Sequence, residues 1–275
     1  MKYKFVYPKF DSIVEFGIRV GGFGLGNCLF VYSKALIASK EENLLLINPT
    51  WINLSPGSIL RNENDKRSYF GIFRSFGITG IYKFLLLYCN IFFKIFNKNT
   101  KIIRGIDSYF TDLLPFQNLI KENIFSITKD SNYLLENNFA NKIAVHVRLG
   151  DYDSVKRLEI DWYVYIINTI NLKTNFKYEI LLFSDGKPSE LKDILNIKNV
   201  KRAFFGNAML DILAISECDL IIGSNSTFSA WACFLGQKPA IFCLNYFGNV
   251  HVKKDLIACV NIYDPIPDYI LNKVI

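Results

Sequence analysis

Histidine is scarce in this 275-residue chain, and its cysteines lack the close spacing typical of metal sites. There are two histidines and six cysteines, and no two cysteines form a CxxC motif. Structural and catalytic zinc sites are built from Cys and His at short spacings, so no metal site is expected. No secretory signal opens the sequence, since Asp11 and Glu15 soon follow a mixed start. We therefore expect reduced, mostly buried cysteines and a cytoplasmic location.

Three further absences narrow the function. No run of 18 apolar residues occurs, so no clear membrane-spanning helix is expected. The phosphate-binding pattern GxxxxGK[ST] is missing, which disfavours ATP hydrolysis. The nucleophile pattern GxSxG is missing as well, which disfavours Ser-His-Asp hydrolysis.

The positive charge is concentrated in one segment. The net charge is +7, and residues 61–104 carry nine basic and two acidic side chains, so this segment alone accounts for it. A net charge of this size is modest for a nucleic-acid binder, and we expect no nucleic-acid partner. Hydrophobic residues make up 51% of the chain, which excludes disorder and allows a sizeable core.

The same segment contains the apolar stretch Ile81–Phe96, which Lys83, Asn90 and Lys94 interrupt. Two interpretations stay open. Residues 81–101 could form a peripheral contact with an anionic membrane surface, or the stretch could be a buried helix of its domain.

The hydrophobic pattern predicts an α/β protein. In the second half, strands and helices alternate strictly, with strands expected at 142–147, 178–183, 200–205, 220–222 and 240–243. This alternation predicts a parallel, doubly wound sheet. In the first half, a strand over 13–20, a glycine turn over 21–27, a helix over 29–40 and a strand over 44–47 are expected. Helices are also expected near 78–96 and 111–122.

Ligands of such sheets bind beyond the carboxyl ends of the strands, where this chain has polar clusters. The glycine turn GGFGLGN can approach an anion, but Asn27 stands where a dinucleotide motif needs its third glycine, so an NAD site is disfavoured. The second cluster is HVRLGDY at 146–152, in which Arg148 offers a permanent cation. Asp151 and Asp153 form a D-x-D pattern, which can hold a divalent metal, but so short a pattern is a weak signal and a metal site there is not expected.

Two more clusters follow later strands. Asp185 of FSDG can accept hydrogen bonds from a ligand or cap the next helix, and the two readings stay even. GSNSTFSAW at 223–231 gathers four hydroxyls and an amide at a helix start, which is more than one N-cap requires. An Arg, an Asp and a hydroxyl-rich helix start would suit a nucleoside diphosphate.

With these residues the sequence resembles the bacterial α-1,2-fucosyltransferase family, which are inverting, GDP-fucose-dependent glycosyltransferases. GLGNCLFVYSKA at 24–35 is similar to the family's GGLGNQLFQYA, and HVRLGDY is similar to HxRRGDY. FSDG at 183–186 is similar to FSDD, and DILAISECDLIIGSNSTFSAW at 211–231 is similar to the family's final motif, which ends in NSTFSWW. The motifs stand in the family order over about 20–40 and 142–245.

The resemblance implies a GT-B-like fold of two Rossmann-like, doubly wound domains facing a cleft. We place an acceptor-side domain at 1–140 and a nucleotide-sugar-binding domain at 141–275. It also implies metal independence and no cofactor beyond the donor. The implied site residues are Arg148 on the pyrophosphate, His146 and Asp185 near guanine and ribose, Asn225, Ser226, Thr227 and Ser229 around phosphate, and Gly24, Gly26 and Asn27 closing on the donor from the N-terminal side.

Several positions depart from the family pattern. Leu149 replaces the second Arg, Gly186 the second Asp, and Cys28 the Gln; Leu220 replaces a His and Ala230 a Trp. From the resemblance we still predict transfer of fucose from GDP-β-L-fucose to a sugar hydroxyl, α-1,2 to galactose. The expected acceptor is a soluble or lipid-linked glycan in surface polysaccharide (O-antigen) or oligosaccharide synthesis. Another nucleotide sugar, or a non-catalytic binding protein, stays an alternative. Asp151 is the nominated base, with Asp153, Glu159 and Asp161 as rivals.

Overall fold

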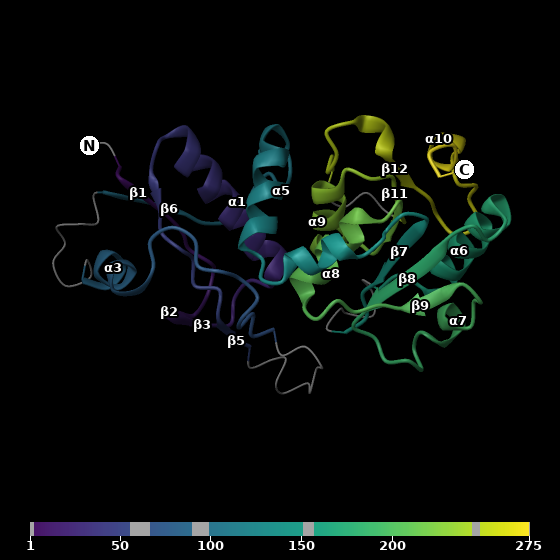
Figure 1. Cartoon of the computed structure of the whole chain (residues 1–275), viewed down its shortest axis with the longest axis horizontal. Coiled ribbons are helices and arrows are strands. Elements are labelled where there is room, and N and C mark those ends of the chain that lie inside the picture. The colour runs from purple at the N-terminus through teal and green to yellow at the C-terminus, as the bar shows by residue number, and fades with distance from the viewer. Residues whose placement is uncertain (1–2, 56–66, 90–98, 151–156, 244–247, 275) are drawn as a thin grey trace. The chain divides into compact units, whose positions relative to one another are not determined.

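The computed structural model describes residues 3–55, 67–89, 99–150, 157–243 and 248–274. The chain divides into two compact units, Met1–Lys129 and Asp130–Ile275 (Figure 1). The predicted domain boundary at residue 140 falls inside the second unit, in the loop that precedes its first strand.

The second unit is built on a six-stranded sheet in which every neighbouring pair of strands is parallel. The strand order is β12-β11-β10-β7-β8-β9. The strands are β7 (Lys142–Val147), β8 (Glu179–Ser184), β9 (Val200–Arg202), β10 (Leu220–Gly223), β11 (Ala240–Phe242) and β12 (Ile257–Cys259). The chain moves outward from β7 to β9, returns to β10 and moves outward again. The predicted parallel α/β sheet is confirmed, and its order reverses between β7 and β10.

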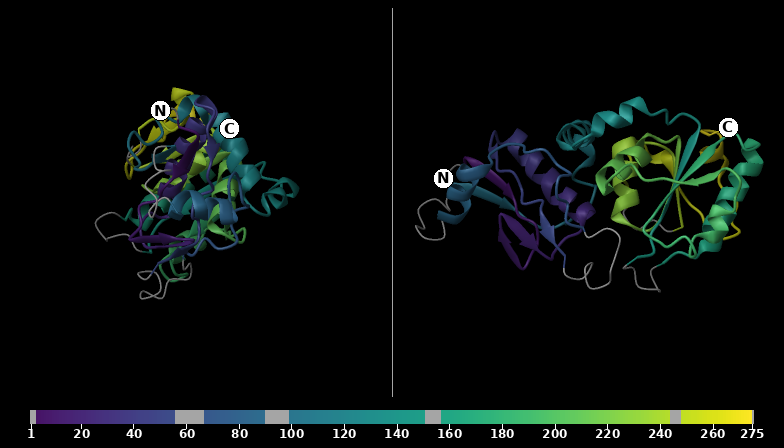
Figure 2. Two further views of the ribbon diagram at one scale, coloured as in Figure 1. Left: turned by 90° about the vertical axis from the view of Figure 1, so that its left-hand side faces the viewer. Right: turned by 60° about the horizontal axis from the view of Figure 1, so that its bottom comes forward.

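Helices cover both faces of this sheet (Figures 1 and 2). One face carries α6 (Ile160–Thr174), α7 (Lys192–Leu195) and α10 (Asp268–Leu271), and the other carries α8 (Ala208–Glu217) and α9 (Thr227–Gly236). Successive side chains of a strand point to opposite faces, so Val145 and Val147 of β7 join the core beneath α6. His146 between them faces the α9 side. The alternation of side chains along β7 thus places His146 on the α9 face of the sheet.

Polar side chains fix where α8 and α9 begin. The side chain of Asn207 accepts hydrogen bonds from the backbone N–H groups of Met209 and Leu210, at 3.0 Å each. The hydroxyl of Ser226 accepts one from the N–H of Phe228 at 3.1 Å. Both are N-caps that satisfy donors left without an intrahelical partner. One of the four hydroxyls near the start of α9 is therefore used as a cap.

The first unit has a parallel three-stranded sheet of order β4-β1-β6 and a second sheet of order β2-β3-β5. The strands are β1 (Phe5–Pro8), β2 (Val14–Phe16), β3 (Ile18–Val20), β4 (Leu45–Leu46), β5 (Asn53–Leu54) and β6 (Thr100–Ile103). Helix α1 (Leu25–Glu41) packs on β1 and is buried on nearly all sides as far as Ala38. Further helices are α3 (Gly80–Phe84), which continues as the π-helix η1 (Leu85–Cys89), and α5 (Gln117–Ile127), which follows the 3₁₀ turn η2 (Leu114–Phe116). Short 3₁₀ turns η3 (Ser131–Glu136) and η5 (Lys254–Leu256) belong to the second unit.

The predicted strand over 13–20 is wrong. These residues form an antiparallel hairpin of β2 and β3 that turns at Gly17, and the strand that precedes α1 in the parallel sheet is β1. Only four residues long and bounded by Lys4 and Lys9, β1 shows too little apolar pattern to be predicted. Among the described helices, none has the length and hydropathy that crossing a bilayer requires.

Candidate functional site

Two polar clusters of the second unit meet at the point where the strand order reverses. Strands β7 and β10 pair in parallel, with Val145 opposite Ile222. The next residues beyond these pairs therefore leave the sheet together, which brings the segment 146–150 beside the segment 223–229. In doubly wound sheets this switch point is where ligands bind. The sequence predicted both clusters, and the strand register brings them together.

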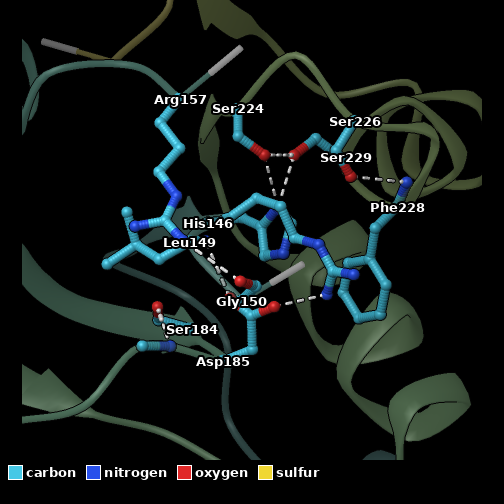
Figure 3. A network of polar contacts seen from close by, with 12 residues as sticks. His146, Leu149, Gly150, Arg157, Ser184, Asp185, Ser224, Ser226, Phe228 and Ser229 are labelled. Carbon is cyan, nitrogen blue, oxygen red and sulfur yellow. Dashed lines mark hydrogen bonds and ion pairs between the residues drawn. The ribbon is translucent and has the colours of Figure 1, made fainter. Parts of the chain in front are cut away.

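His146 is the hub of the contacts between the two segments (Figure 3). Its Nδ1 lies 2.7 Å from the hydroxyl oxygen of Ser229 and 2.9 Å from that of Ser224, and the two hydroxyls are 3.3 Å apart. The ring of Phe228 stacks on the imidazole with centroids 4.6 Å apart. His146 is only 5% exposed and Ser229 is fully buried. The buried imidazole therefore holds the loop after β10 against β7.

The environment keeps His146 neutral. Burial lowers the pKa of His146 to about 3, with the Asp185 carboxylate opposing this shift and the Arg148 cation adding to it. A neutral imidazole has one N–H donor and one acceptor nitrogen, and since a hydroxyl can both donate and accept, Nδ1 can pair with these hydroxyls in either tautomer.

Arg148 is braced by a carboxylate from the next strand. Its Nη1 lies 2.6 Å from Oδ2 of Asp185, and Oδ1 of Asp185 accepts a hydrogen bond from the backbone N–H of Leu149 at 2.8 Å. Strand β8 pairs with β7 so that Val147 lies opposite Ser184, which places Asp185 beside Arg148. The two side chains are 23% and 27% exposed, so the guanidinium is partly accessible to solvent and is not sealed within the protein.

Two glycines allow this close packing. A Cβ on Gly150 would lie 2.4 Å from Oδ2 of Asp185, and a Cβ on Gly186 would lie 2.6 Å from Cδ1 of Leu149. Leu149 is 6% exposed and belongs to the core beneath α6, so its side chain points away from the face of Arg148. Leu149 and Gly186, both departures from the fucosyltransferase motifs, therefore contact each other in the interior.

The start of α9 completes an anion-binding arrangement. Ser226 is the buried N-cap, and Asn225 and Thr227 flank it with half-buried side chains. A helix N-terminus carries a partial positive charge and N–H groups directed outward. Arg148 and this helix start lie on the same side of the sheet, with His146 joining them, and together they suit a phosphate or diphosphate.

Other predicted residues lie elsewhere. Gly24, Gly26 and Asn27 belong to the first unit, where Gly24 precedes α1 and the N–H of Leu25 donates to the Tyr69 hydroxyl at 2.9 Å. Asp151 and Asp153 lie outside the described residues. Their rivals are at the start of α6, where Glu159 is the N-cap residue and Asp161 lies in the first turn.

Within the described ranges, no group of three or more His, Cys, Asp or Glu side chains is placed to hold a metal ion.

The sequence analysis missed several residues that shape the site. Arg157 donates to the backbone oxygen of Gly150 at 3.1 Å, and Arg202 donates to that of Gly186 at 2.8 Å. Ser224 was counted in the hydroxyl cluster but given no role, and Phe228 was not predicted, although both contact His146 directly. Nothing in the sequence marks Phe228, because an aromatic residue in a helix is ordinarily part of the core.

The contacts described above bring an arginine, a carboxylate and a hydroxyl-rich helix start to one end of the sheet, in a sequence without a Walker or dinucleotide motif. The family model described as Glycosyl transferase family 11 matches residues 89–253, which is more than half of the chain and includes all of this site. The chain belongs to glycosyl transferase family 11. This membership confirms the predicted enzyme class, a glycosyltransferase.

Solved structures similar to this glycosyltransferase are distant. The fucosyltransferase NodZ from Bradyrhizobium is 14% identical, with a TM-score of 0.48 over 86% of this chain and 94% of that chain. NodZ α-1,6-fucosyltransferase soaked with GDP-fucose gives a TM-score of 0.45 at 14% identity, over 84% and 92%. POFUT1 in complex with GDP is 11% identical, with a TM-score of 0.41 over 90% and 99%. The comparison with curated proteins found no match.

Proposed function

We propose that this glycosyltransferase is an inverting enzyme that transfers L-fucose from GDP-β-L-fucose to a sugar hydroxyl, α-1,2 to galactose. The observation that carries the proposal is the pairing of β7 with β10 at the switch point of the sheet, which lets the segment that contains Arg148 leave the sheet beside the hydroxyl-rich segment that begins α9. The order of the fucosyltransferase-like motifs along the chain supports GDP-fucose as the donor. The proposal includes a GT-B arrangement with a donor-binding C-terminal domain and an acceptor-side N-terminal domain.

In the proposed reaction the acceptor oxygen attacks the anomeric carbon of fucose while the bond from that carbon to the phosphate oxygen breaks. GDP leaves with the electron pair of the broken bond, so negative charge grows on its terminal phosphate. Arg148 and the N-terminus of α9 stabilise that charge where it develops. They supply the positive charge that lets the donor bind without a metal ion.

Asp185 and His146 position Arg148 and the start of α9 and do not touch the reacting atoms. Asp185 fixes the guanidinium of Arg148 through a 2.6 Å contact, and His146 fixes the loop that begins α9 through Ser224 and Ser229. The predicted contacts of His146, Asp185 and Ser229 with the nucleotide stay predictions. The acceptor proton goes to a carboxylate, for which Asp151 is our nominee.

We further propose that the enzyme works in the cytoplasm on surface polysaccharide, with residues 81–101 touching the membrane surface. Ile81, Tyr82 and Leu85 are 63%, 72% and 47% exposed, which supports an apolar contact face. Lys83 instead turns inward, where its Nζ lies 3.0 Å from the Thr50 hydroxyl oxygen. Residues 90–98 of this segment lie outside the described ranges.

A donor panel tests the proposed function. GDP-fucose, GDP-mannose and UDP-galactose are each incubated with the enzyme and galactose-terminated acceptors, and both released nucleotide and glycosylated product are measured. We expect product with GDP-fucose alone. Product only with another donor would refute fucose as the transferred sugar, and GDP binding without any release would indicate a non-catalytic protein.

A further inference from the structure

The first unit contains a cavity that the donor site does not include. Its volume is about 530 Å³, within the ordinary range of small-molecule pockets. It is lined by the segment after β4 (residues 48–52), by residues 69–75, and by parts of α3 and η1. The segment after β4 leaves the carboxyl end of a parallel strand, which is a typical place for a ligand.

Aromatic side chains form much of the cavity wall. Trp51 stacks on Phe73 with ring centroids 4.0 Å apart, and Phe84 contacts Tyr88 with centroids 5.3 Å apart. Phe70, which also lines the cavity, is 75% exposed. Flat aromatic surfaces at the mouth of a cavity offer contact area to the apolar C–H face of a sugar ring.

The charges on the cavity wall all have one sign. Among the described residues that line it, the ionisable side chains with a formal charge are Arg74, Lys83 and Lys129, and none is acidic. Lys83 is the most enclosed, since its Nζ contacts the Thr50 hydroxyl and lies 5.7 Å from the centroid of the Tyr7 ring. Burial lowers the pKa of Lys83 to about 8, against the opposing effect of the nearby Glu15 carboxylate. The positive charge of the Lys83 ammonium is therefore only partly balanced by the Glu15 carboxylate.

Glu15 does not act as a counter-charge to Lys83 from within the cavity. It does not line the cavity, and one of its carboxylate oxygens accepts a hydrogen bond from the Tyr7 hydroxyl. The hydroxyl of Tyr88 donates to the backbone oxygen of Glu15 at 3.1 Å, which ties the hairpin β2-β3 to η1 behind the wall. The Glu15 carboxylate is therefore paired with Tyr7 outside the cavity lining, and the backbone of Glu15 makes the contact with the wall residue Tyr88.

A buried donor on the same wall has no partner. Trp51 is 6% exposed, and within the described part of the chain its indole Nε1–H makes no hydrogen bond. Buried tryptophan N–H groups normally find an acceptor, because leaving one unpaired costs about 1–3 kcal/mol. That nitrogen is itself covered by neighbouring atoms, so the contacts of a ligand are assigned to Lys83 and to the aromatic faces.

We propose that this cavity binds an acidic saccharide, with a sugar ring against the aromatic wall and its anionic group against Lys83. In this proposal the acceptor glycan carries a negatively charged sugar next to the hydroxyl that receives fucose. The proposal therefore rests on the proposed function. The anionic group is a carboxylate, as in a uronic acid, or a phosphate, as in a glycosyl phosphate. Both present oxygens to the ammonium of Lys83.

The test measures binding to the full-length protein by ligand-observed NMR, without donor. Methyl β-glucuronide and glucose 1-phosphate are compared with methyl β-glucoside, and inorganic phosphate and acetate serve as anions without a ring. We expect each acidic sugar to bind about tenfold more tightly than the neutral glycoside and the free anions, since a charge-assisted hydrogen bond is added. A preference for one acidic sugar identifies the carboxylate or the phosphate as the natural group. Equal binding of neutral and acidic sugars, or of free phosphate and glucose 1-phosphate, would overturn the proposal.

Variants assign the effect to the cavity. Lys83→Met should abolish the preference for acidic sugars and Lys83→Arg should retain it, whereas Lys40→Met, at an exposed position of α1 outside the cavity, should change nothing. GDP binding is measured on the same samples. Retained GDP binding with no acidic preference would overturn this inference alone, and absent GDP binding in the wild type would instead count against the proposed function. An unchanged preference in Lys83→Met would also overturn the inference.

Discussion

The neutral, buried state of His146 predicts a specific dependence of stability on pH. Burial lowers the pKa of His146 to about 3, and that of His251 to about 4, where the ring also hydrogen-bonds the backbone oxygen of Lys238 at 2.7 Å. In the unfolded chain both histidines titrate near pH 6.5. Below that value the unfolded state binds more protons than the folded state, so the free energy of unfolding decreases as the pH falls.

The size of this loss follows from the two pKa values. Between pH 7 and pH 5 the unfolded chain becomes protonated at each histidine, while the folded protein stays neutral at both. At about 1.4 kcal/mol per pKa unit, each histidine then contributes a loss of about 2 kcal/mol, and the two together about 4 kcal/mol. Carboxylates do not enter this window, because they titrate mainly below it.

Urea unfolding at several pH values between 5 and 7.5, followed by tryptophan fluorescence, measures the slope. Two of the three tryptophans, Trp162 and Trp231, lie in the second unit with both histidines. In His146→Gln the pH-dependent loss should be about half that of the wild type, with His251→Gln as the matched variant. Because the slope is measured and not the absolute stability, general destabilisation does not confuse the result. An unchanged slope in His146→Gln would refute the neutral, buried imidazole.

Three other predictions concern the site and its surroundings. Ser229→Ala removes a fully buried hydroxyl from His146 and should lower the free energy of unfolding by about 1–3 kcal/mol, as measured by urea denaturation. Gly150→Ala places a methyl group where Oδ2 of Asp185 lies and should weaken GDP binding by about tenfold in calorimetry while the fold is kept, because Arg148 loses its brace. The enzyme should float with anionic but not with neutral vesicles, and replacing Ile81 and Tyr82 by Ser should abolish flotation. If the wild-type enzyme does not float with anionic vesicles, the proposed membrane contact is wrong.

The second unit could be predicted well because its elements are regular. Continuous apolar strands alternate with helices there, and polar residues at strand ends are rare enough to be noticed. The strand order, however, was not contained in any local pattern. It is the pairing of β7 with β10 that brings Arg148 and the start of α9 to one crevice.

The first unit was harder to predict for physical reasons. Strand β1 is too short to show a pattern, and the hairpin β2-β3 resembles one longer strand because Gly17 alone separates its two strands in the sequence. The role of Leu149 could not be predicted either. Its neighbour Arg148 faces the crevice, whereas Leu149 itself packs into the core against the position of Gly186, and only the three-dimensional packing shows that contact.

Calorimetric titration with guanosine, GMP and GDP tests most directly whether Arg148 and the start of α9 bind a diphosphate. The account predicts that GDP binds most tightly and that Arg148→Ala weakens GDP by about tenfold or more while changing guanosine little. Lys201→Ala, which removes a 72%-exposed cation from the same sheet, should leave all three affinities unchanged. A folded Arg148→Ala protein that binds GDP as tightly as the wild type would contradict the account.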